Sequence, residues 1–538
     1  MAKDLRHISR RQFLAAGTCG AMTIGPLVNT LAQLSLVNSA VANTSGEGLD
    51  MEDDFKALVC IFLRGGCDMN NVLIPRSNSE FLAEYAQKRG VVGIPNGYVP
   101  GSSDGYDQAL DDTLILSDPS NTNSNYNLGL HPNMPNLNSL FNDGTAAFVT
   151  NVGTLAFPTD PQNYGSVSLP KQLFSHSDQQ TQWMSSISDR PYVSGWGARV
   201  AELYYDSWNT LSNTSMLITA GGNNRLMSGS KKSPQYAVST NGAISLAGFG
   251  DNYSDALQAN GTYKNTREGR RLQALENIMQ FSHAHLIEDT YANTVARARG
   301  SEGTIQDALG VEDALGVDFD NIFNQFGANN ELGNELKVIA RLIAGRRETG
   351  NVRQMFFVDL GGFDAHQSVN IDLPILLDQV DRAIGEFNAT LKEIDAKEAE
   401  QRSDKSIGDL YNRVLTFEAS DFNRTWTPNG NNFETAGTDH GWGTHCFVVG
   451  GPVDGGKFYG QFPDLIVGGN NDVPNRGRGR WIPTTSVDQY AAMLAKWFGV
   501  PENSTEMATI FPNLYRFDSP FSESSSIQFI KPQFFDQV

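Results

Sequence analysis

The residues of this sequence that could do chemistry gather in five short polar clusters. One of them is GGFDAH at 361–366, in which Asp364 and His366 stand two positions apart. Residues two apart in an extended segment face the same side, so these side chains could bind one metal ion. Imidazole and carboxylate together suit zinc or manganese, with calcium as a further candidate. The alternative is a hydrogen-bonded pair without an ion.

A glycine-rich cluster, GTDHGWGTH at 437–445, contains Asp439, His440 and His445. Two histidines and an aspartate in such a loop are hard to explain by packing, which favours metal binding or catalysis. The distribution of histidines points the same way, because four of the eight in the chain lie in the polar clusters.

Two clusters place an aspartate after an apolar run. Asp68 follows such a run and a glycine pair, so it could be a metal ligand or could form an Asx turn. Asp421 follows another run and is a candidate metal ligand or base, and Arg424 is a candidate for holding a substrate anion. The alternative for this second pair is a surface salt bridge.

The fifth cluster, SHSDQQ at 175–180, sets hydroxyl groups beside an imidazole. At the start of a helix, Ser175, His176 and Ser177 suit a nucleophile or an anion-binding site. The alternative is that Ser175 or Ser177 caps the helix.

Strands and helices must bring these clusters together. Five apolar runs predict buried strands. They lie at 57–63, 145–151, 355–360, 413–417 and 447–449. Amphipathic helical patterns between them, at 334–346 and 373–394, predict a mostly parallel α/β sheet. In such sheets ligands bind beyond the carboxyl ends of the strands, and most of the polar clusters follow a predicted strand.

Composition limits the class of protein. The chain has 538 residues and a formal net charge of -20, which disfavours nucleic acid as a partner because neutralising phosphates needs clustered Lys and Arg. The stretch from about 200 to 330 begins rich in Gly, Asn and Ser and predicts a loop-rich insertion or cap. We expect residues 43–538 to form one domain that includes it.

Residues 1–42 have the pattern of an export signal. The motif SRRQFL at 9–14 resembles the twin-arginine (Tat) signal, and AVA at 40–42 suits cleavage. The alternative is a membrane anchor, but Gly17 and Pro26 interrupt the apolar stretch and make it a poor spanning helix. We therefore expect the Tat machinery to export a periplasmic or secreted protein, with no membrane span in the mature chain.

The motifs together resemble one family, the secreted bacterial proteins that carry the domain of unknown function 1501. The resemblance covers nearly the whole chain after the signal and is weakest at 200–330. Its segments are LRGGCDMNN at 63–71, GLHP at 129–132, SHSDQQTQW at 175–183, GGFDAH at 361–366, SDFNRT at 420–425, GTDHGWGTHCFVVGGPVDGGKFYG at 437–460, TTSVDQYAAMLAKWFGV at 484–500 and IFPNL at 510–514.

That family in turn resembles the alkaline phosphatase and sulfatase superfamily, which implies a doubly wound core with metal ligands after its strands. By this resemblance Ser175 or Ser177 takes the nucleophile position. The resemblance assigns metal-binding positions to Asp68, Asp364, His366, Asp421, His440 and His445.

The residues and the resemblance lead us to expect an exported metal-dependent hydrolase of phosphate or sulfate esters. Arg64 and Arg424 would hold the anionic ester, and a serine or a water would attack it. The alternative is a non-catalytic envelope or secreted protein that keeps the hydrolase core for binding or assembly, with a second secreted protein as its partner. A cofactor-binding oxidoreductase ranks last, because the sequence shows no dinucleotide fingerprint.

Overall fold

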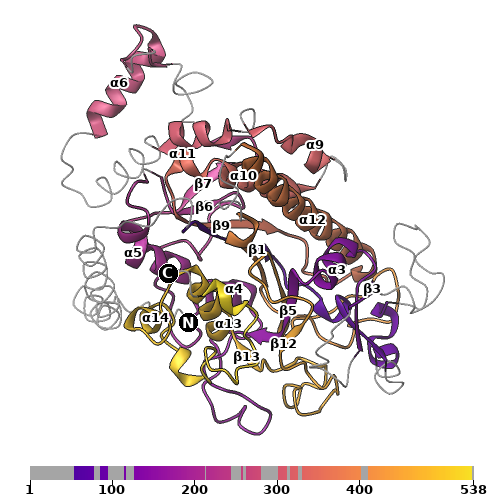
Figure 1. Ribbon diagram of the computed structural model, residues 1–538. Coiled ribbons are helices and arrows are strands. Elements are labelled where there is room, and N and C mark those ends of the chain that lie inside the picture. Colours follow the sequence, from indigo (N-terminus) through magenta and orange to yellow (C-terminus); the bar gives the residue numbers. More distant parts are fainter. Residues whose placement is uncertain are drawn as a thin grey trace, which may run out of the picture.

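A buried strand at the centre of the fold shows why the apolar runs form one sheet. In the computed structural model of the chain, β1 (Lys56–Leu63) lies between β9 (Arg353–Leu360) and β10 (Val414–Ser420) and is parallel to both (Figure 1). Its side chains enter two cores in alternation, with Val59 on one face of the sheet and Cys60 on the other. Because both faces are covered, the strand is continuously apolar.

The structure describes most of the chain after residue 53. The described residues are 54–77, 85–94, 114–116, 127–212, 214–243, 256–258, 262–279, 301–311, 315–324, 330–401 and 410–535. The expected export signal at 1–42 lies outside them, as does part of the expected insertion at 200–330.

Among the described residues, ten strands form the central sheet, in the order β12-β5-β11-β10-β1-β9-β6-β7-β8 with β13 beside β5. The strands not yet located are β5 (Ala146–Gly153), β6 (Leu217–Thr219), β7 (Tyr236–Ser239), β8 (Gly242–Ala243), β11 (Thr444–Val449), β12 (Phe458–Gly460) and β13 (Thr485–Ser486). Six of the pairings are parallel, which confirms the prediction of an α/β fold with a mostly parallel sheet.

The direction of β11 is the feature of the sheet that matters most for the polar clusters. β11 is antiparallel to both neighbours, β10 and β5. Its amino end therefore lies at the same edge as the carboxyl ends of the parallel strands. The glycine-rich cluster at 437–445 leads into β11, so it reaches the same edge as the clusters that follow β1, β9 and β10.

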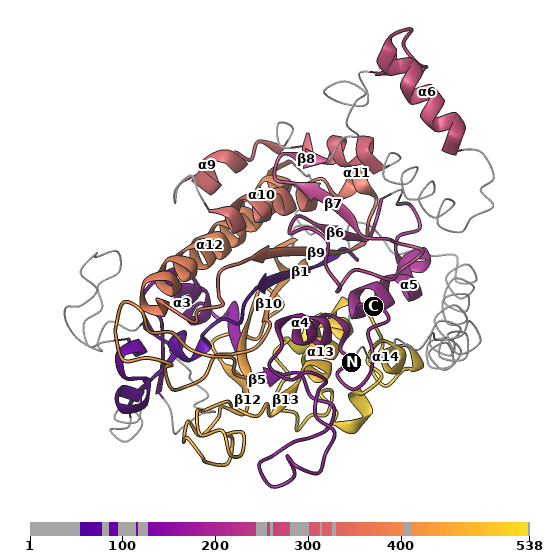
Figure 2. The ribbon, with the colours of Figure 1, turned by 180° about the vertical axis from the view of Figure 1, so that it is seen from behind.

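Helices cover both faces of the sheet (Figure 1 and Figure 2). One face carries α3 (Pro135–Asn142), α10 (Glu331–Ala344) and α12 (Val369–Gln401). The other carries α4 (His176–Ser185), α5 (Trp196–Trp208), α13 (Val487–Phe498) and α14 (Thr505–Ile510). The helices expected at 334–346 and 373–394 correspond to α10 and α12.

Shorter elements complete the described fold. A second sheet has the order β2-β4-β3. Its strands are β2 (Leu73–Ser77), β3 (Leu114–Ile115) and β4 (Asn127–Leu130). The remaining helices are η1 (Met69–Asn71), η2 (Gly90–Val92), α6 (Arg267–Met279), α9 (Phe319–Asn324), α11 (Arg346–Thr349), η5 (Leu410–Arg413), η6 (Leu514–Arg516) and η7 (Pro532–Phe534).

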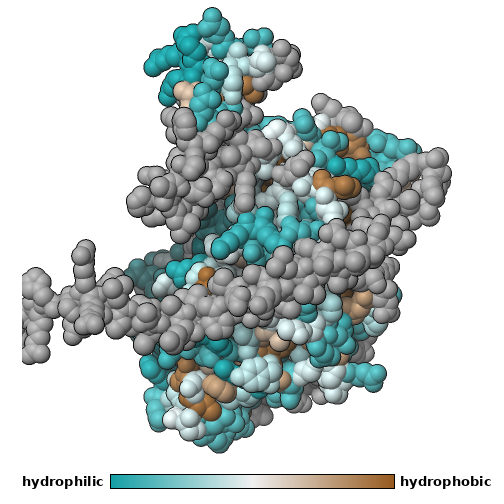
Figure 3. All heavy atoms as spheres, turned by 90° about the vertical axis from the view of Figure 1, so that its left-hand side faces the viewer, coloured by the Kyte–Doolittle hydropathy of each residue, from teal (hydrophilic) through white to brown (hydrophobic). Residues whose placement is uncertain are grey.

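The stretch at 200–330 supplies both sheet and an outlying helix. β6, β7 and β8 extend the sheet beyond β9. The helix α6 lies apart from the two helix layers in Figure 1 and Figure 2, and its surface is mostly hydrophilic in Figure 3. None of the helices in the described ranges is both long and apolar enough to cross a membrane.

The turn after β1 makes a testable prediction about how the clusters are held together. Gly65 has φ +113°, and a Cβ there would lie 2.3 Å from the backbone nitrogen of Asp364. We expect Gly65→Ala to lower the free energy of unfolding by about 2 kcal/mol or more, because both the backbone conformation and the contact become unfavourable. Urea unfolding measures the change. Gly361→Ala is the matched control, since a Cβ at Gly361 meets nothing within 4 Å; equal losses in both variants would contradict the prediction.

Candidate metal centre

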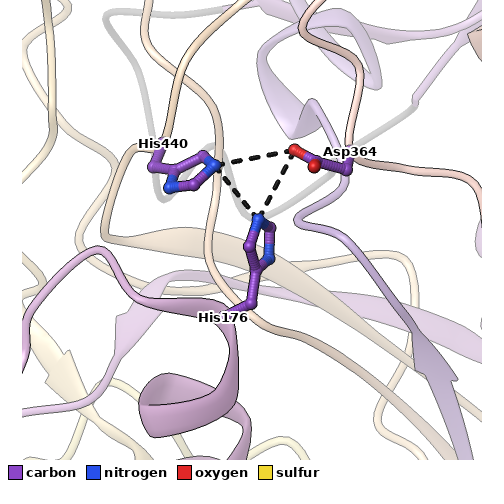
Figure 4. A group of neighbouring side chains, drawn as sticks. All are labelled: His176, Asp364 and His440. Atoms are coloured by element: carbon purple, nitrogen blue, oxygen red, sulfur yellow. Dashed lines mark hydrogen bonds and ion pairs between the residues drawn. The ribbon is translucent and has the colours of Figure 1, made fainter.

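Three histidines and one aspartate converge at the edge of the sheet. His176 is the first residue of α4, Asp364 and His366 follow β9, and His440 precedes β11. Figure 4 shows the ring nitrogens of His176 and His440 directed at one carboxylate oxygen of Asp364. The antiparallel course of β11 is what brings His440 to residues that follow parallel strands.

The contacts among these four side chains are short. The Nε2 atom of His440 lies 3.0 Å from Nε2 of His176 and 2.9 Å from Nε2 of His366. The Oδ1 atom of Asp364 lies 3.5 Å from His176, 3.2 Å from His366 and 3.6 Å from His440, measured to Nε2 in each case. His176, Asp364 and His440 offer ligand atoms that all lie within 4.8 Å of one another, so these three could hold a metal ion.

The spacing is the one that a small tetrahedral ion requires. With bonds of about 2.0–2.1 Å to a central zinc, tetrahedral ligand atoms lie about 3.3 Å apart. The measured contacts run from 2.9 to 3.6 Å. His366 adds a fourth donor that contacts both Asp364 and His440. The ligand atoms of His176, Asp364 and His440 are therefore close enough together to be ligands of one ion, and His366 lies beside two of them.

A second layer of hydrogen bonds fixes each histidine ring. The Nδ1 atom of His176 lies 2.7 Å from Oδ2 of Asp421, and the Nδ1 atom of His366 lies 3.0 Å from Oδ1 of Asp439. The Nδ1–H group of His440 donates to the carbonyl oxygen of Phe174 at 2.7 Å. Since carboxylates and carbonyls only accept, each Nδ1 carries a proton, and a neutral ring in this tautomer turns its Nε2 lone pair inward. Metal-binding histidines are oriented in this way.

The electrostatics of the group call for a cation. Three inward lone pairs and a carboxylate repel one another unless a proton or a metal ion lies between them. The hydrogen bond to Asp421 raises the pKa of His176, whereas burial lowers the pKa of His440. Burial raises the pKa of Asp364, but the hydrogen bond and charge of Arg424, together with the nearby His176 and His366, outweigh it and leave the pKa below its ordinary value. Asp364 is thus held as a carboxylate.

Arg424 is placed to position Asp364. Its side chain is fully buried, and its Nη1 donates to Asp364 at 2.8 Å and to the carbonyl of Gly65 at 3.1 Å. Its Nη2 donates to the carbonyl of Thr438 at 2.5 Å. These bonds direct the guanidinium to protein groups, in contrast to the expectation that Arg424 would hold a substrate anion. Arg64, the other expected anion holder, forms an ion pair with Asp359.

Asp421 and Asp439 lie behind the histidines, not among the inner donors. Besides His176, Asp421 accepts a hydrogen bond from Nε2 of Gln180 at 2.9 Å. Asp439 forms an ion pair with Arg478. Burial raises the pKa of Asp439, but the contacts with Arg478, Asn429 and His366 together leave it below its ordinary value. Both carboxylates were expected as direct ligands, and the structure gives them contacts with ring Nδ1 atoms instead.

The structure places two expected metal ligands elsewhere. Asp68 is fully buried and pairs with Arg89 at 2.5 Å. His445 is buried, its Nδ1 accepts the backbone N–H of Asn151 at 3.2 Å, and its ring stacks on Phe462 at 4.8 Å. No contact in the described ranges joins either residue to the four converging side chains.

The two candidate serines stand at the start of α4. Ser175 occupies the N-cap position without a capping hydrogen bond from its side chain. Its hydroxyl donates to Asp178 at 2.6 Å, and the hydroxyl of Ser177 donates to the same carboxylate at 3.3 Å. Neither hydroxyl contacts the histidines within the part of the chain that the structure describes.

Several residues of the centre carried no clear signal in the sequence. Phe174 contributes through its backbone carbonyl, which any residue type could supply. Gln180 lies one helical turn after His176, a spacing that could have suggested a shared contact. The arginines of RGRGR at 476–480 are a visible basic run, and Arg480 donates from Nε to the carbonyl of His440 at 2.7 Å.

The fold and the centre define an α/β protein whose mostly parallel ten-stranded sheet carries a cluster of candidate metal ligands at one edge. Residues 55–475 match the family described as protein of unknown function DUF1501, and the chain belongs to that family. Searches of the curated proteins and of the solved structures found no match.

The buried pair of Asp68 and Arg89 makes a prediction that separates structure from metal binding. We expect Asp68→Asn to lower the free energy of unfolding by about 3 kcal/mol, because the charge of Arg89 stays buried without its partner. The variant that remains folded should keep the metal content of the wild type. Urea unfolding measures the change in stability, and elemental analysis measures the metal content. Loss of metal from the folded Asp68→Asn variant would show that Asp68 is a ligand.

The buried imidazole of His445 predicts a dependence of stability on pH. Burial lowers the pKa of His445 to about 3, whereas the pKa of a histidine in an unfolded chain is about 6.5. Between these values the unfolded chain binds a proton that the folded chain excludes, so stability is lost as pH falls. The expected slope is about 1.4 kcal/mol per pH unit for this residue. Urea unfolding at pH 6 and pH 4.5 should show a smaller difference for His445→Asn than for the wild type; an unchanged difference would contradict the prediction.

Proposed function

We propose that the protein is an exported metal-dependent hydrolase that acts on phosphate or sulfate esters. Zinc or manganese would be held by His176, Asp364, His366 and His440. The observation that carries the proposal is that His176, Asp364 and His440 offer ligand atoms within 4.8 Å of one another, with His366 in contact with Asp364 and His440. The same proposal includes export of the protein through the Tat pathway and a likeness of the protein to the alkaline phosphatase and sulfatase superfamily.

The donor set favours zinc or manganese over calcium. Three imidazole nitrogens and one carboxylate are typical of zinc sites and are also accepted by manganese. Calcium takes six to eight oxygen ligands, and three of the four inner donors here are nitrogens. The side chains of the group are between 23% and 48% exposed, so a substrate could reach them.

The charge of the centre favours an anionic substrate. Around a divalent ion, the carboxylates of Asp364, Asp421 and Asp439 are offset in part by the guanidiniums of Arg424 and Arg478. With neutral histidines, the whole group would carry a net charge of about +1. An ester oxygen that bears negative charge is attracted to such a centre, even though the chain as a whole carries -20.

Each protein group has a part in the proposed reaction. A divalent ion held by His176, Asp364 and His440 would supply Lewis-acid chemistry toward the ester and a bound water. Arg424 keeps Asp364 ionised and in place, and Asp421 holds the ring of His176. The hydroxyls of Ser175 and Ser177 bond to Asp178, which favours water over serine as the attacking group.

Metal content and ester turnover test the proposal together. Elemental analysis of the purified mature protein should find zinc or manganese, and a panel of phosphate and sulfate esters should find turnover. We expect His440→Ala to lose most of the metal and to lower turnover by about 100-fold or more, because an inner donor is removed. Asp178→Asn is the control and should keep its metal, since Asp178 bonds to the serines rather than to the histidines.

The outcomes separate the two functions expected from the sequence. A protein that contains no metal after purification and cannot be loaded with zinc or manganese would overturn the proposal. Bound metal without turnover of any ester would favour the non-catalytic binding or assembly protein. Unchanged turnover in Ser175→Ala and Ser177→Ala would support water as the nucleophile.

A further inference from the structure

Two arginines beside the candidate metal centre form no ion pair with an acid among the described residues. Arg476 and Arg480 flank Arg478 in the segment at 475–480. Arg478 pairs with Asp439, but no carboxylate among the described residues forms an ion pair with Arg476 or Arg480. Guanidiniums without an acidic partner attract a ligand of opposite charge, even in a chain of net charge -20.

Both guanidiniums lie against one aromatic ring. The guanidinium carbon of Arg476 lies 5.8 Å from the ring centre of Phe174, and that of Arg480 lies 5.3 Å from it. Arg480 is fixed further, since its Nε donates to the carbonyl of His440 at 2.7 Å. Stacking on a ring restrains an arginine while leaving its terminal N–H groups free to bind an anion.

Phe174 joins these arginines to the metal centre. Its carbonyl accepts the Nδ1–H of His440, and its backbone N–H donates to Oε1 of Gln179 at 2.8 Å. The residue has φ +74°, a left-handed conformation that is costly for a bulky side chain. Strain of this kind persists where surrounding contacts impose it, and it gathers at binding sites. The same residue therefore orients a candidate ligand and carries the two arginines.

We propose that Arg476 and Arg480 bind the tetrahedral oxyanion of the substrate, whether phosphate or sulfate, and so determine the specificity of the centre. The proposal rests on the proposed function and adds the residues that recognise the substrate. Arginine presents its N–H donors in a planar fork that matches two oxygens of such an anion. The assignment moves anion binding from Arg424, which is buried against Asp364, to the exposed Arg476 and the half-buried Arg480.

Binding of inorganic phosphate and of inorganic sulfate to the full-length mature protein tests the proposal by calorimetry. The variants are Arg476→Gln and the double variant Arg476→Gln/Arg480→Gln. We expect Kd for the preferred anion to rise about tenfold for each arginine removed, with metal content unchanged. For an ester that is turned over, KM should rise much more than kcat falls. Arg476 is exposed and forms no side-chain hydrogen bond or ion pair with another described residue, so its single variant should fold.

The control is Arg516→Gln. Arg516 also stacks on a phenylalanine, Phe157, at 4.3 Å, but its Nη2 is already paired with Asp189 at 2.9 Å. It should bind both anions like the wild type. Wild-type affinity in the double variant would overturn the proposal, because the anion would then be held by other groups. The wild-type protein could bind an anion yet contain no metal and turn over no ester. If the double variant then lost anion binding, the result would support the arginine site and reject the hydrolase. Comparing phosphate with sulfate identifies which anion the site prefers.

Discussion

Repulsion among like groups at one point is the constraint on which the candidate site depends. His440 faces ring nitrogens of both His176 and His366, and all three rings turn a nitrogen toward the carboxylate of Asp364. Hydrogen bonds on the far side of each ring prevent the rings from turning away. Such an arrangement is stable only with positive charge at its centre, which is why it is interpreted as a site for a cation.

The sheet is what makes this arrangement possible. β1, β9 and β10 run side by side, so the turns that follow them meet at one edge and bring Arg424 against Asp364. The reversed direction of β11 adds His440 from a segment that precedes its strand. The first turn of α4 then adds His176 from the helix layer. Four segments spread over more than 260 positions of the chain therefore supply one site.

The arginines around the site fall into two groups, those that form an ion pair with an aspartate and those that do not. Arg89, Arg424 and Arg478 each pair with an aspartate and stabilise the positions of loops or ligands. Arg476 and Arg480 contact a ring and a backbone carbonyl instead, and they keep their positive charge for another partner. A guanidinium buried against a carboxylate is a structural element, whereas a restrained and unpaired one is suited to binding an anion.

The sequence by itself determined the apolar strands, the two long helices, the mostly parallel sheet and the family, because these follow from local periodicity and ordered motifs. It also selected Asp364, His366 and His440, whose residue types and neighbours stand out. Only the tertiary structure distinguished these from Asp68 and His445, which have equally suggestive neighbours but lie in a buried ion pair and an aromatic stack. The direction of β11 and the pairing of each arginine were likewise decided in three dimensions. The physical reason is that whether a polar side chain can bind an ion depends on which groups, far away in the chain, already occupy its donors and acceptors.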